Sequence, residues 1–283
     1  MGPGFKYHVV TVAAIFFALT IGLVVGSLFV SPQLVDRQTR VLKDIRATLI
    51  QDNEAQKQKV ERYQKFLAEI MPSLLNGKLA GMPVAIVQTG DYSEAVNPVR
   101  EALQMADARV LSVTTIARPF DRPDEILAPS LVALHAKDPR FPTDREGLAR
   151  NIASLLAHGD APDNGLMAAL EREGFVQTEP GSDYQTPARY VVIVAGSRIE
   201  GTTRPANVDR PLIAALQKQG LSVVACEPQD ALASDITAYR ALDMDVATVE
   251  NVDTDIGHCA LVFALRGDKD DSDVKAASRL PLP

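Results

Sequence analysis

The pattern of apolar and polar positions begins with a long uncharged apolar run. Residues 9–30 read VVTVAAIFFALTIGLVVGSLFV, and Ser31-Pro32 follow. At about 1.5 Å per residue, about 20 helical residues cross a hydrocarbon core of ~30 Å, and a helix satisfies its own backbone polar groups. No other apolar run in the sequence approaches this length. We therefore predict a single transmembrane helix as an N-terminal anchor over residues 1–32.

Two other interpretations of this run fit it less well. A secretory signal peptide has a shorter apolar core and a cleavage site with small residues, and here only Gly26-Ser27 offers a weak site. A helix buried in a soluble core is usually shorter and amphipathic. We therefore favour an anchor that is retained in the membrane.

Small residues recur every four positions within the predicted anchor. Small side chains let helix backbones approach closely in lipid, where no hydrophobic effect drives packing. Alanine and glycine are also common in spanning helices in general, which is the plainer explanation. The ridge nonetheless predicts that the anchor packs against a second copy of itself. Its members are Ala14, Ala18, Gly22 and Gly26, and it ends in a GxxxG motif.

A polar, helix-forming stretch follows the anchor and predicts a stalk over residues 33–72. It contains no glycine or proline between positions 34 and 71, and we expect the helix to end at Met71-Pro72. Its apolar positions are spaced by 3, 4, 11, 3, 4 and 3 residues, as in two short heptad runs joined by a stutter. We predict a coiled coil, and hence a homo-oligomer through anchor and stalk. The alternative is one amphipathic helix that lies on its own domain. The apolar positions are Leu42, Ile45, Leu49, Val60, Tyr63, Leu67 and Ile70.

From residue 73 to residue 266, short β-branched runs alternate with helical stretches. Continuous apolar strands separated by helices indicate βαβ units and a parallel sheet. We therefore predict a Rossmann-like α/β domain with a mainly parallel sheet. Residues 256–265 could form a final helix or a strand, and the charged residues 267–283 predict a disordered tail. The predicted strands are Val84–Val87, Arg109–Thr114, Tyr190–Val194, Leu221–Ala225 and Val246–Val249.

Composition and charge limit the classes of function. With 46% hydrophobic and 23% charged residues the chain is globular, and its net charge of −7 argues against a nucleic-acid surface, which is normally basic. The sequence has no P-loop and no G-x-G-x-x-G motif, and Ala195-Gly196-Ser197-Arg198 does not fit the nucleophile elbow of hydrolases. We therefore expect a membrane-associated protein that is not an enzyme.

Two glycine-containing loops follow predicted strands and are candidate ligand loops. Gly196 to Gly201 lie between a strand and a helix, where a helix N-terminus could bind an anion, and Gly90 lies in the corresponding loop of the first βαβ unit. We favour the alternative of a plain βα connection, because many α/β folds carry such loops without a ligand. If a ligand binds, we expect it at these strand ends.

Three residues could ligate a soft metal ion. Cys226 ends a predicted strand, and His258 and Cys259 are adjacent in the last apolar segment. Thiolates select Cu(I), and imidazole also suits copper. Adjacent residues on a regular element point in different directions, however. A buried free cysteine is often a small hydrophobic residue and nothing more, and we favour that alternative.

Three stretches of the sequence carry a family resemblance: YHVVTVAAIFFAL at residues 7–19 with Gly22 and Gly26-Ser27, VAIV at residues 84–87, and GHCALVFAL at residues 257–265. Together they resemble the MctB family of copper transport proteins of the bacterial envelope. The resemblance implies one N-terminal span, a domain outside the cytoplasm and a role in copper efflux or copper homeostasis. Copper is implied by the resemblance alone, and no ligand set comes with it. The alternative is a bitopic envelope scaffold that recruits partners and has no metal chemistry.

Charges that flank the predicted span bear on its orientation. The four basic residues after the span outnumber Lys6 before it, so the positive-inside rule would place the domain in the cytoplasm. Long domains can cross the membrane regardless of such charges, and the family resemblance places the domain outside. We therefore expect an extracytoplasmic C-terminal domain. The basic residues are Arg37, Arg40, Lys43 and Arg46.

Overall fold

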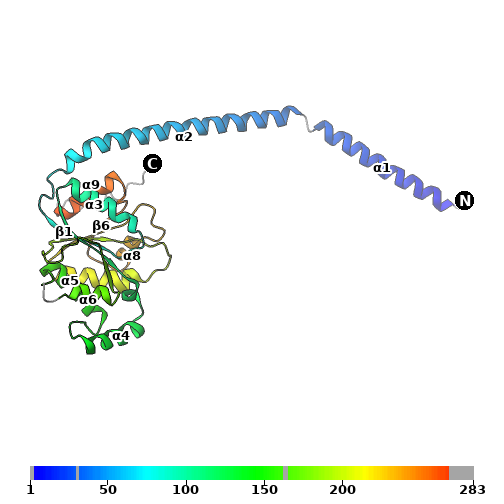
Figure 1. Cartoon of the computed structure of the whole chain (residues 1–283). Coiled ribbons are helices and arrows are strands. Elements are labelled where there is room, and N and C mark those ends of the chain that lie inside the picture. Colours follow the sequence, from blue (N-terminus) through cyan, green and yellow to red (C-terminus); the bar gives the residue numbers. More distant parts are fainter. Residues whose placement is uncertain (1–2, 30–31, 162–164, 268–283) are drawn as a thin grey trace. The chain divides into compact units, whose positions relative to one another are not determined.

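The chain forms two compact units, Met1–Lys65 and Phe66–Pro283. The computed structural model describes residues 3–29, 32–161 and 165–267. The first unit is helical and the second is built around a β-sheet (Figure 1). The predicted tail, apart from Gly267, lies outside the described residues.

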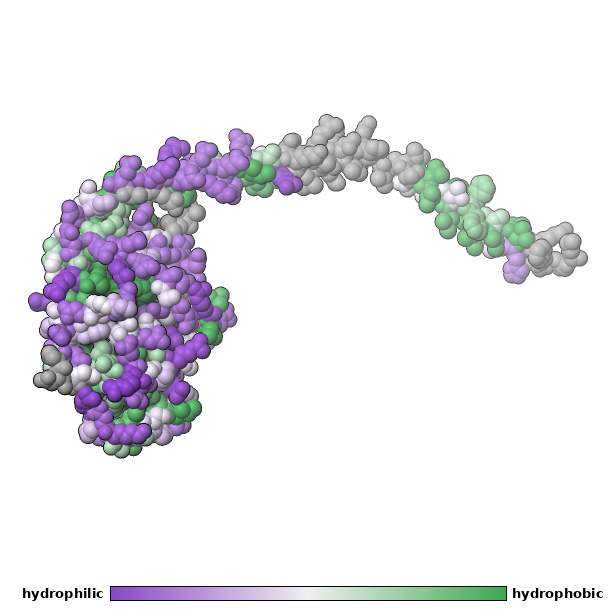
Figure 2. All heavy atoms as spheres, in the orientation of Figure 1, coloured by the Kyte–Doolittle hydropathy of each residue, from purple (hydrophilic) through white to green (hydrophobic). Residues whose placement is uncertain are grey.

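The first unit contains the predicted anchor. Helix α1 spans Pro3–Phe29, and its segment Tyr7–Gly26 has a mean hydropathy of 2.6 with no residue buried. The helix is long and apolar enough to cross a membrane, and its apolar side chains form the green surface in Figure 2. All four residues of the small-residue ridge are exposed, and a Cβ added at Gly22 or Gly26 would meet no atom within 4 Å.

Helix α2 spans Pro32–Leu75 and continues through Pro72. The prediction that it ends at Met71-Pro72 is therefore wrong. Proline normally ends a helix because it lacks the N–H that would bond four residues back. Here Met71 and Leu75 lie about one turn apart and are both buried in the core of the second unit, and this burial offsets the missing hydrogen bond. Earlier in the helix Leu49, Val60 and Tyr63 remain exposed.

The second unit holds a six-stranded sheet in the order β3-β2-β1-β4-β5-β6. All neighbouring strands pair in parallel except β3, which is antiparallel to β2 at one edge. The predicted mainly parallel α/β fold is thus confirmed, while the sequence pattern missed β3. The strands are β1 (Pro83–Gln88), β2 (Arg109–Ile116), β3 (Val176–Thr178), β4 (Tyr190–Val194), β5 (Ser222–Cys226) and β6 (Ala247–Val249).

Helices cover both faces of this sheet and give it two apolar layers (Figure 1). Because strand side chains alternate, Val84 and Ile86 enter one layer while Ala85 and Val87 enter the other. The first layer is closed by α3 (Val96–Met105), α9 (Asp255–Arg266) and the last turns of α2. The second layer is closed by α4 (Asp124–Lys137), α5 (Arg145–His158), α6 (Leu166–Arg172), α7 (Arg210–Lys218) and α8 (Asp235–Ala241).

The closing apolar segment 256–265 is part of a helix, which decides between the two predicted alternatives. Thr254 caps α9 by accepting a hydrogen bond from the Gly257 N–H at 3.1 Å. Asp255 in the first turn and Arg266 in the last turn suit the helix dipole. A Cβ at position 257 would lie 1.9 Å from the Asn251 carbonyl oxygen, so glycine alone lets α9 approach this loop.

Candidate functional site

The two candidate ligand loops meet where the direction of winding reverses. After β1 the chain passes through α3 on one face to β2, and after β4 it passes through α7 on the other face to β5. Strands β1 and β4 are neighbours, so their following loops lie side by side at the carboxyl edge. Open parallel sheets place their ligands at such a switch point.

Backbone hydrogen bonds connect these two loops. Thr89 and Gly90 both donate to the Val194 carbonyl oxygen at 3.0 Å, and Asp91 N–H donates to the Gly196 carbonyl oxygen at 2.9 Å. A Cβ at position 90 would lie 2.5 Å from the Gly196 oxygen, so glycine is required for this approach. The loops therefore form one continuous edge of the sheet.

Three N–H groups at the start of the second loop are already paired within the chain. Gly196 N–H donates to Asp235 Oδ2 at 2.7 Å, Ser197 N–H to the Ala233 oxygen at 3.0 Å, and Arg198 N–H to Asp91 Oδ2 at 3.3 Å. Gly201 is exposed in a turn with φ +71°. Anion binding by the loop from Gly196 to Gly201 stays a prediction, and binding at these three N–H groups would need them to exchange partners.

Three acidic side chains are buried beneath the loops. Asp209 is fully buried, and its Oδ2 accepts a hydrogen bond from the Tyr239 hydroxyl at 2.8 Å. Burial and then the charge of Asp235 raise the pKa of Asp209 to about 7. Burial also raises the pKa of Asp235 to about 6, and raises that of Glu227. This group of carboxyls can therefore hold a proton near neutral pH.

Hydrogen bonding in this carboxyl cluster is incomplete. Glu227 is satisfied, since it accepts from Ser234 Oγ at 2.6 Å and from Asp235 N–H at 2.9 Å. Three other buried oxygens, Thr89 Oγ1, Asp209 Oδ1 and Asp235 Oδ1, make no hydrogen bond of ordinary geometry with a described residue, although the Thr89 hydroxyl is close enough to Asp209 to lower the pKa of that carboxyl. An unpartnered buried oxygen costs about 1–3 kcal/mol, and protonation of one carboxyl would supply a donor.

A surface hollow of about 350 Å³ opens beside the same loops. Arg118, Arg122 and Arg204 line it together with Asp91 and Asp121. Arg204 donates to the Thr89 carbonyl oxygen, and its Nη1 lies 3.4 Å from Asp91 Oδ1. Charges of both signs make the hollow suited to a polar ligand and unsuited to an apolar one.

Sequence reasoning missed the carboxyl cluster and the arginines. Glu227 could have been found, because it follows a buried strand directly at the carboxyl edge. Asp235 could have been read as part of a helix start after Ser234. Asp209 carries no such signal, since it resembles any aspartate on a surface helix until the fold buries it.

The three predicted metal residues lie in or beside one apolar layer. Cys226 is fully buried at the end of β5, and Cys259 is half-buried on α9 against the same layer. In the part of the chain that the structure describes, no group of three or more His, Cys, Asp and Glu side chains is placed to hold a metal ion. His258 and Cys259 are consecutive on a helix and therefore point about 100° apart.

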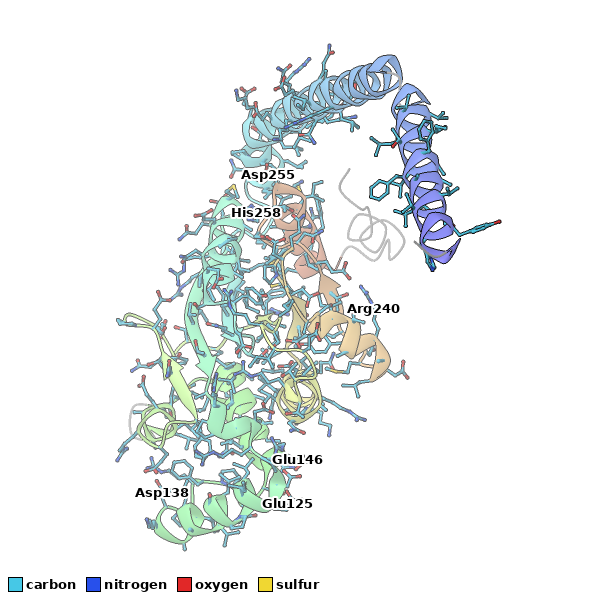
Figure 3. The ribbon with its side chains drawn as sticks, turned by 90° about the vertical axis from the view of Figure 1, so that its right-hand side faces the viewer. Glu125, Asp138, Glu146, Arg240, Asp255 and His258 are labelled. Carbon is cyan, nitrogen blue, oxygen red and sulfur yellow. The ribbon has the colours of Figure 1, made fainter. Side chains whose placement is uncertain are left out.

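His258 is buried without a hydrogen-bond partner. It is 8% exposed, and neither Nδ1 nor Nε2 has a partner among the described residues. Burial lowers the pKa of His258. The negative charges of Asp255, Glu101 and Asp253 act in the opposite direction, but the effect of burial is larger. The imidazole is therefore held toward the neutral form, which is the form that ligates metals. Figure 3 labels His258 and Asp255 on the first turns of α9.

A fourth residue approaches this part of α9. Cys259 Sγ lies 3.2 Å from Met71 Sδ in the last turns of α2. Thioether, thiol and imidazole groups are soft or intermediate donors and suit Cu(I) better than magnesium or calcium. The sequence did not predict the contact between Met71 and Cys259, because no short motif links positions separated by 188 residues.

The sequence matches the model of the family described as "Copper transport outer membrane protein, MctB" over residues 4–274. This match covers nearly the whole chain. The chain belongs to the MctB family. It is also 21% identical over 285 residues to proteins named "Copper transporter MctB" from Mycobacterium bovis and from two strains of Mycobacterium tuberculosis. The alignment covers 92% of this chain and 91% of each relative.

Membership in the MctB family confirms the resemblance inferred from the sequence. The match takes in the apolar helix, α2 and the whole α/β domain, so the likeness is not confined to the hydrophobic anchor. The MctB-family chain therefore combines a helix able to cross a membrane with an α/β domain that contains the buried carboxyl cluster and the contact between Cys259 and Met71.

Proposed function

We propose that this protein is a single-pass membrane protein of the cell envelope that takes part in copper efflux or copper homeostasis. The observation that carries the proposal is the family match over residues 4–274, because it spans anchor and domain together. The three relatives aligned over nine-tenths of the chain are named copper transporters. Their description speaks of transport, and we likewise infer a transport or accessory role instead of catalysis.

A deletion strain tests the copper role. We expect cells without the gene to hold more copper and to stop growing at a lower copper concentration than the parent. Cell copper is measured by mass spectrometry, and the full-length gene should restore the parental values. A matched challenge with zinc controls for general weakness of the envelope. Unchanged copper content and unchanged copper tolerance would reject the proposal.

We also infer that the α/β domain lies outside the cytoplasm and is Rossmann-like. The family's description as outer membrane proteins supports the outward placement. The strand order, with α3 and α7 on opposite faces, supports the Rossmann-like classification. Protease added to cells with a permeabilised outer layer should cut the domain while a cytoplasmic marker stays intact. Protection of both would place the domain inside.

We further propose that anchor and stalk form a homo-oligomer. Leu49, Val60 and Tyr63 are exposed on α2, and a parallel coiled coil would bury them against copies of the same helix. Because Gly22 and Gly26 leave space on α1, a second helix could approach there closely.

Cross-linking in native membranes tests the oligomer. We expect wild-type chains to cross-link as discrete oligomers and Gly22→Ile to reduce their yield several-fold, because a large side chain separates the two backbones. Phe16→Leu, away from the ridge on the same helix, is the matched control and should cross-link as wild type. Strictly monomeric wild-type protein would contradict the proposal. It would favour the alternative of one amphipathic helix that lies on its own domain.

A further inference from the structure

The loops that follow three neighbouring strands meet around the surface hollow at the carboxyl edge of the sheet. Its lining residues fall at position 91 after β1, within 118–122 after β2, and within 197–204 after β4. These strands occupy consecutive places in the sheet, in the order β2-β1-β4. Ligands of open parallel sheets bind at this edge, and the volume of about 350 Å³ lies at the lower end of small-molecule sites, about 300–1,000 Å³.

The hollow carries an excess of positive charge. Three arginines and two aspartates line it, in a chain whose net charge is −7. Arg204 and Asp91 offset each other, since Arg204 Nη1 lies 3.4 Å from Asp91 Oδ1. The guanidinium groups of Arg118 and Arg122 make no hydrogen bond or ion pair with any other residue that the structure describes, and both side chains are exposed. They are therefore free to pair with an anion.

The opposite side of the hollow is held in place by the fold. The side chain of Arg204 is only 12% exposed, and it donates to the Thr89 carbonyl oxygen. The Thr202 hydroxyl accepts from the Arg204 N–H at 3.3 Å, which leaves its own O–H as a donor. A π-helical turn, Pro205–Asp209, follows directly, and such turns are rare and occur often at functional sites. A ligand would thus meet a preformed surface on this side.

We propose that the hollow binds a small organic oxyanion, a molecule that carries a carboxylate or phosphate group. The guanidinium fork matches the two oxygens of such a group and binds them with two parallel hydrogen bonds. Ile199, which is 59% exposed, also lines the hollow and offers apolar surface to a carbon skeleton. Among the described residues that line it there is no Cys, Met or His, so this inference does not rest on the proposed copper function.

Calorimetric titration of the full chain in an uncharged detergent tests the site. The probes are citrate and glycerol 3-phosphate, and glycerol is the uncharged counterpart of the second. We expect saturable binding of one anion per chain and no binding of glycerol. Binding of citrate would identify the carboxylate as the recognised group, and binding of glycerol 3-phosphate would identify the phosphate.

Charge-removing variants locate the binding. Arg118→Gln and Arg122→Gln should each weaken the affinity at least tenfold. Their circular dichroism and unfolding temperature should stay close to wild type, because both side chains are exposed and unpaired among the described residues. Arg189→Gln is the matched control: it changes the net charge equally, is also exposed, and directly precedes β4 at the opposite edge of the sheet.

The control variant Arg189→Gln should bind the anion as wild type does. Three results would overturn the site: no saturable binding of either anion by the wild type, unchanged affinity in Arg118→Gln and Arg122→Gln, or an equal loss of affinity in Arg189→Gln. The last result would mean that the anion responds only to the net charge of the chain.

Discussion

Replacing Asp209 with asparagine should make the protein more stable at pH 8 and remove much of its loss of stability between pH 5 and pH 8. Asp209 is fully buried beside Asp235, and burial followed by this neighbouring charge raises its pKa to about 7. An asparagine keeps the shape and can still accept the hydrogen bond from the Tyr239 hydroxyl. It carries no charge at any pH.

The sign of this effect follows from proton binding. The pKa of Asp209 is about 7 in the folded chain and has an ordinary value of 3.8, so the folded state binds the proton more tightly. Its contribution to stability is complete below pH 3.8 and is lost as the pH rises through about 7. Between pH 5 and pH 7 the loss is on the order of 3 kcal/mol, at about 1.4 kcal/mol per pH unit. Asp235, with a pKa of about 6, adds a loss in the same direction.

Chemical unfolding of the full chain in a mild detergent, followed by tyrosine fluorescence at several pH values, measures this dependence. Tyr239→Phe is the informative companion variant. Its lost hydrogen bond would raise the pKa of Asp209 further, and the fall in stability should move to higher pH. A variant Asp209→Asn with the same pH profile as wild type would show that Asp209 does not bind the proton.

The sequence was sufficient to predict the elements whose patterns are local. The uncharged run before Ser31 has the length of a spanning helix, and the runs at Val84–Val87 and Tyr190–Val194 are apolar on both faces as parallel strands require. Strand β3 was missed because three residues give no periodicity, and its pairing with β2 joins residues 60 to 64 positions apart. Helix α2 passes Pro72 because the core beyond it buries Leu75, which no local pattern reveals.

The candidate sites also contain some features that the sequence predicts and others that depend on the fold. The rule that ligands gather at the carboxyl edge was enough to bring Gly90 and Gly196 together, and the structure joins their loops. The chemistry beneath them was hidden, because Asp209 becomes unusual only through burial. The contact of Cys259 with Met71 was hidden as well, since it depends on how α2 packs against α9.

Replacing Arg145 with methionine should destabilise the protein by about 3–5 kcal/mol, because three backbone carbonyl oxygens lose their donor at a cost of about 1–3 kcal/mol each when they stay buried. The side chain is 8% exposed at the start of α5. Its guanidinium donates to the carbonyl oxygens of Phe120, Arg122 and Asn207, and to Asp124 Oδ1 at 2.8 Å. Methionine fills part of the volume but leaves these backbone acceptors unpaired, and that is the main cost.

Arg150→Met provides the matched control on the same helix. Arg150 is 64% exposed and lies 3.8 Å from Asp144 Oδ1, which is also exposed, so its loss should change stability by no more than about 0.5 kcal/mol. Asp124→Asn separates the ion pair from the carbonyl bonds. The Asp124 side chain is 75% exposed, so this variant should lose far less stability than Arg145→Met. Equal losses of stability for Arg145→Met and Arg150→Met in the same unfolding experiment would contradict this prediction. They would mean that the three carbonyl oxygens find other donors, and that Arg145 does not hold the loop before α4 against the start of α5.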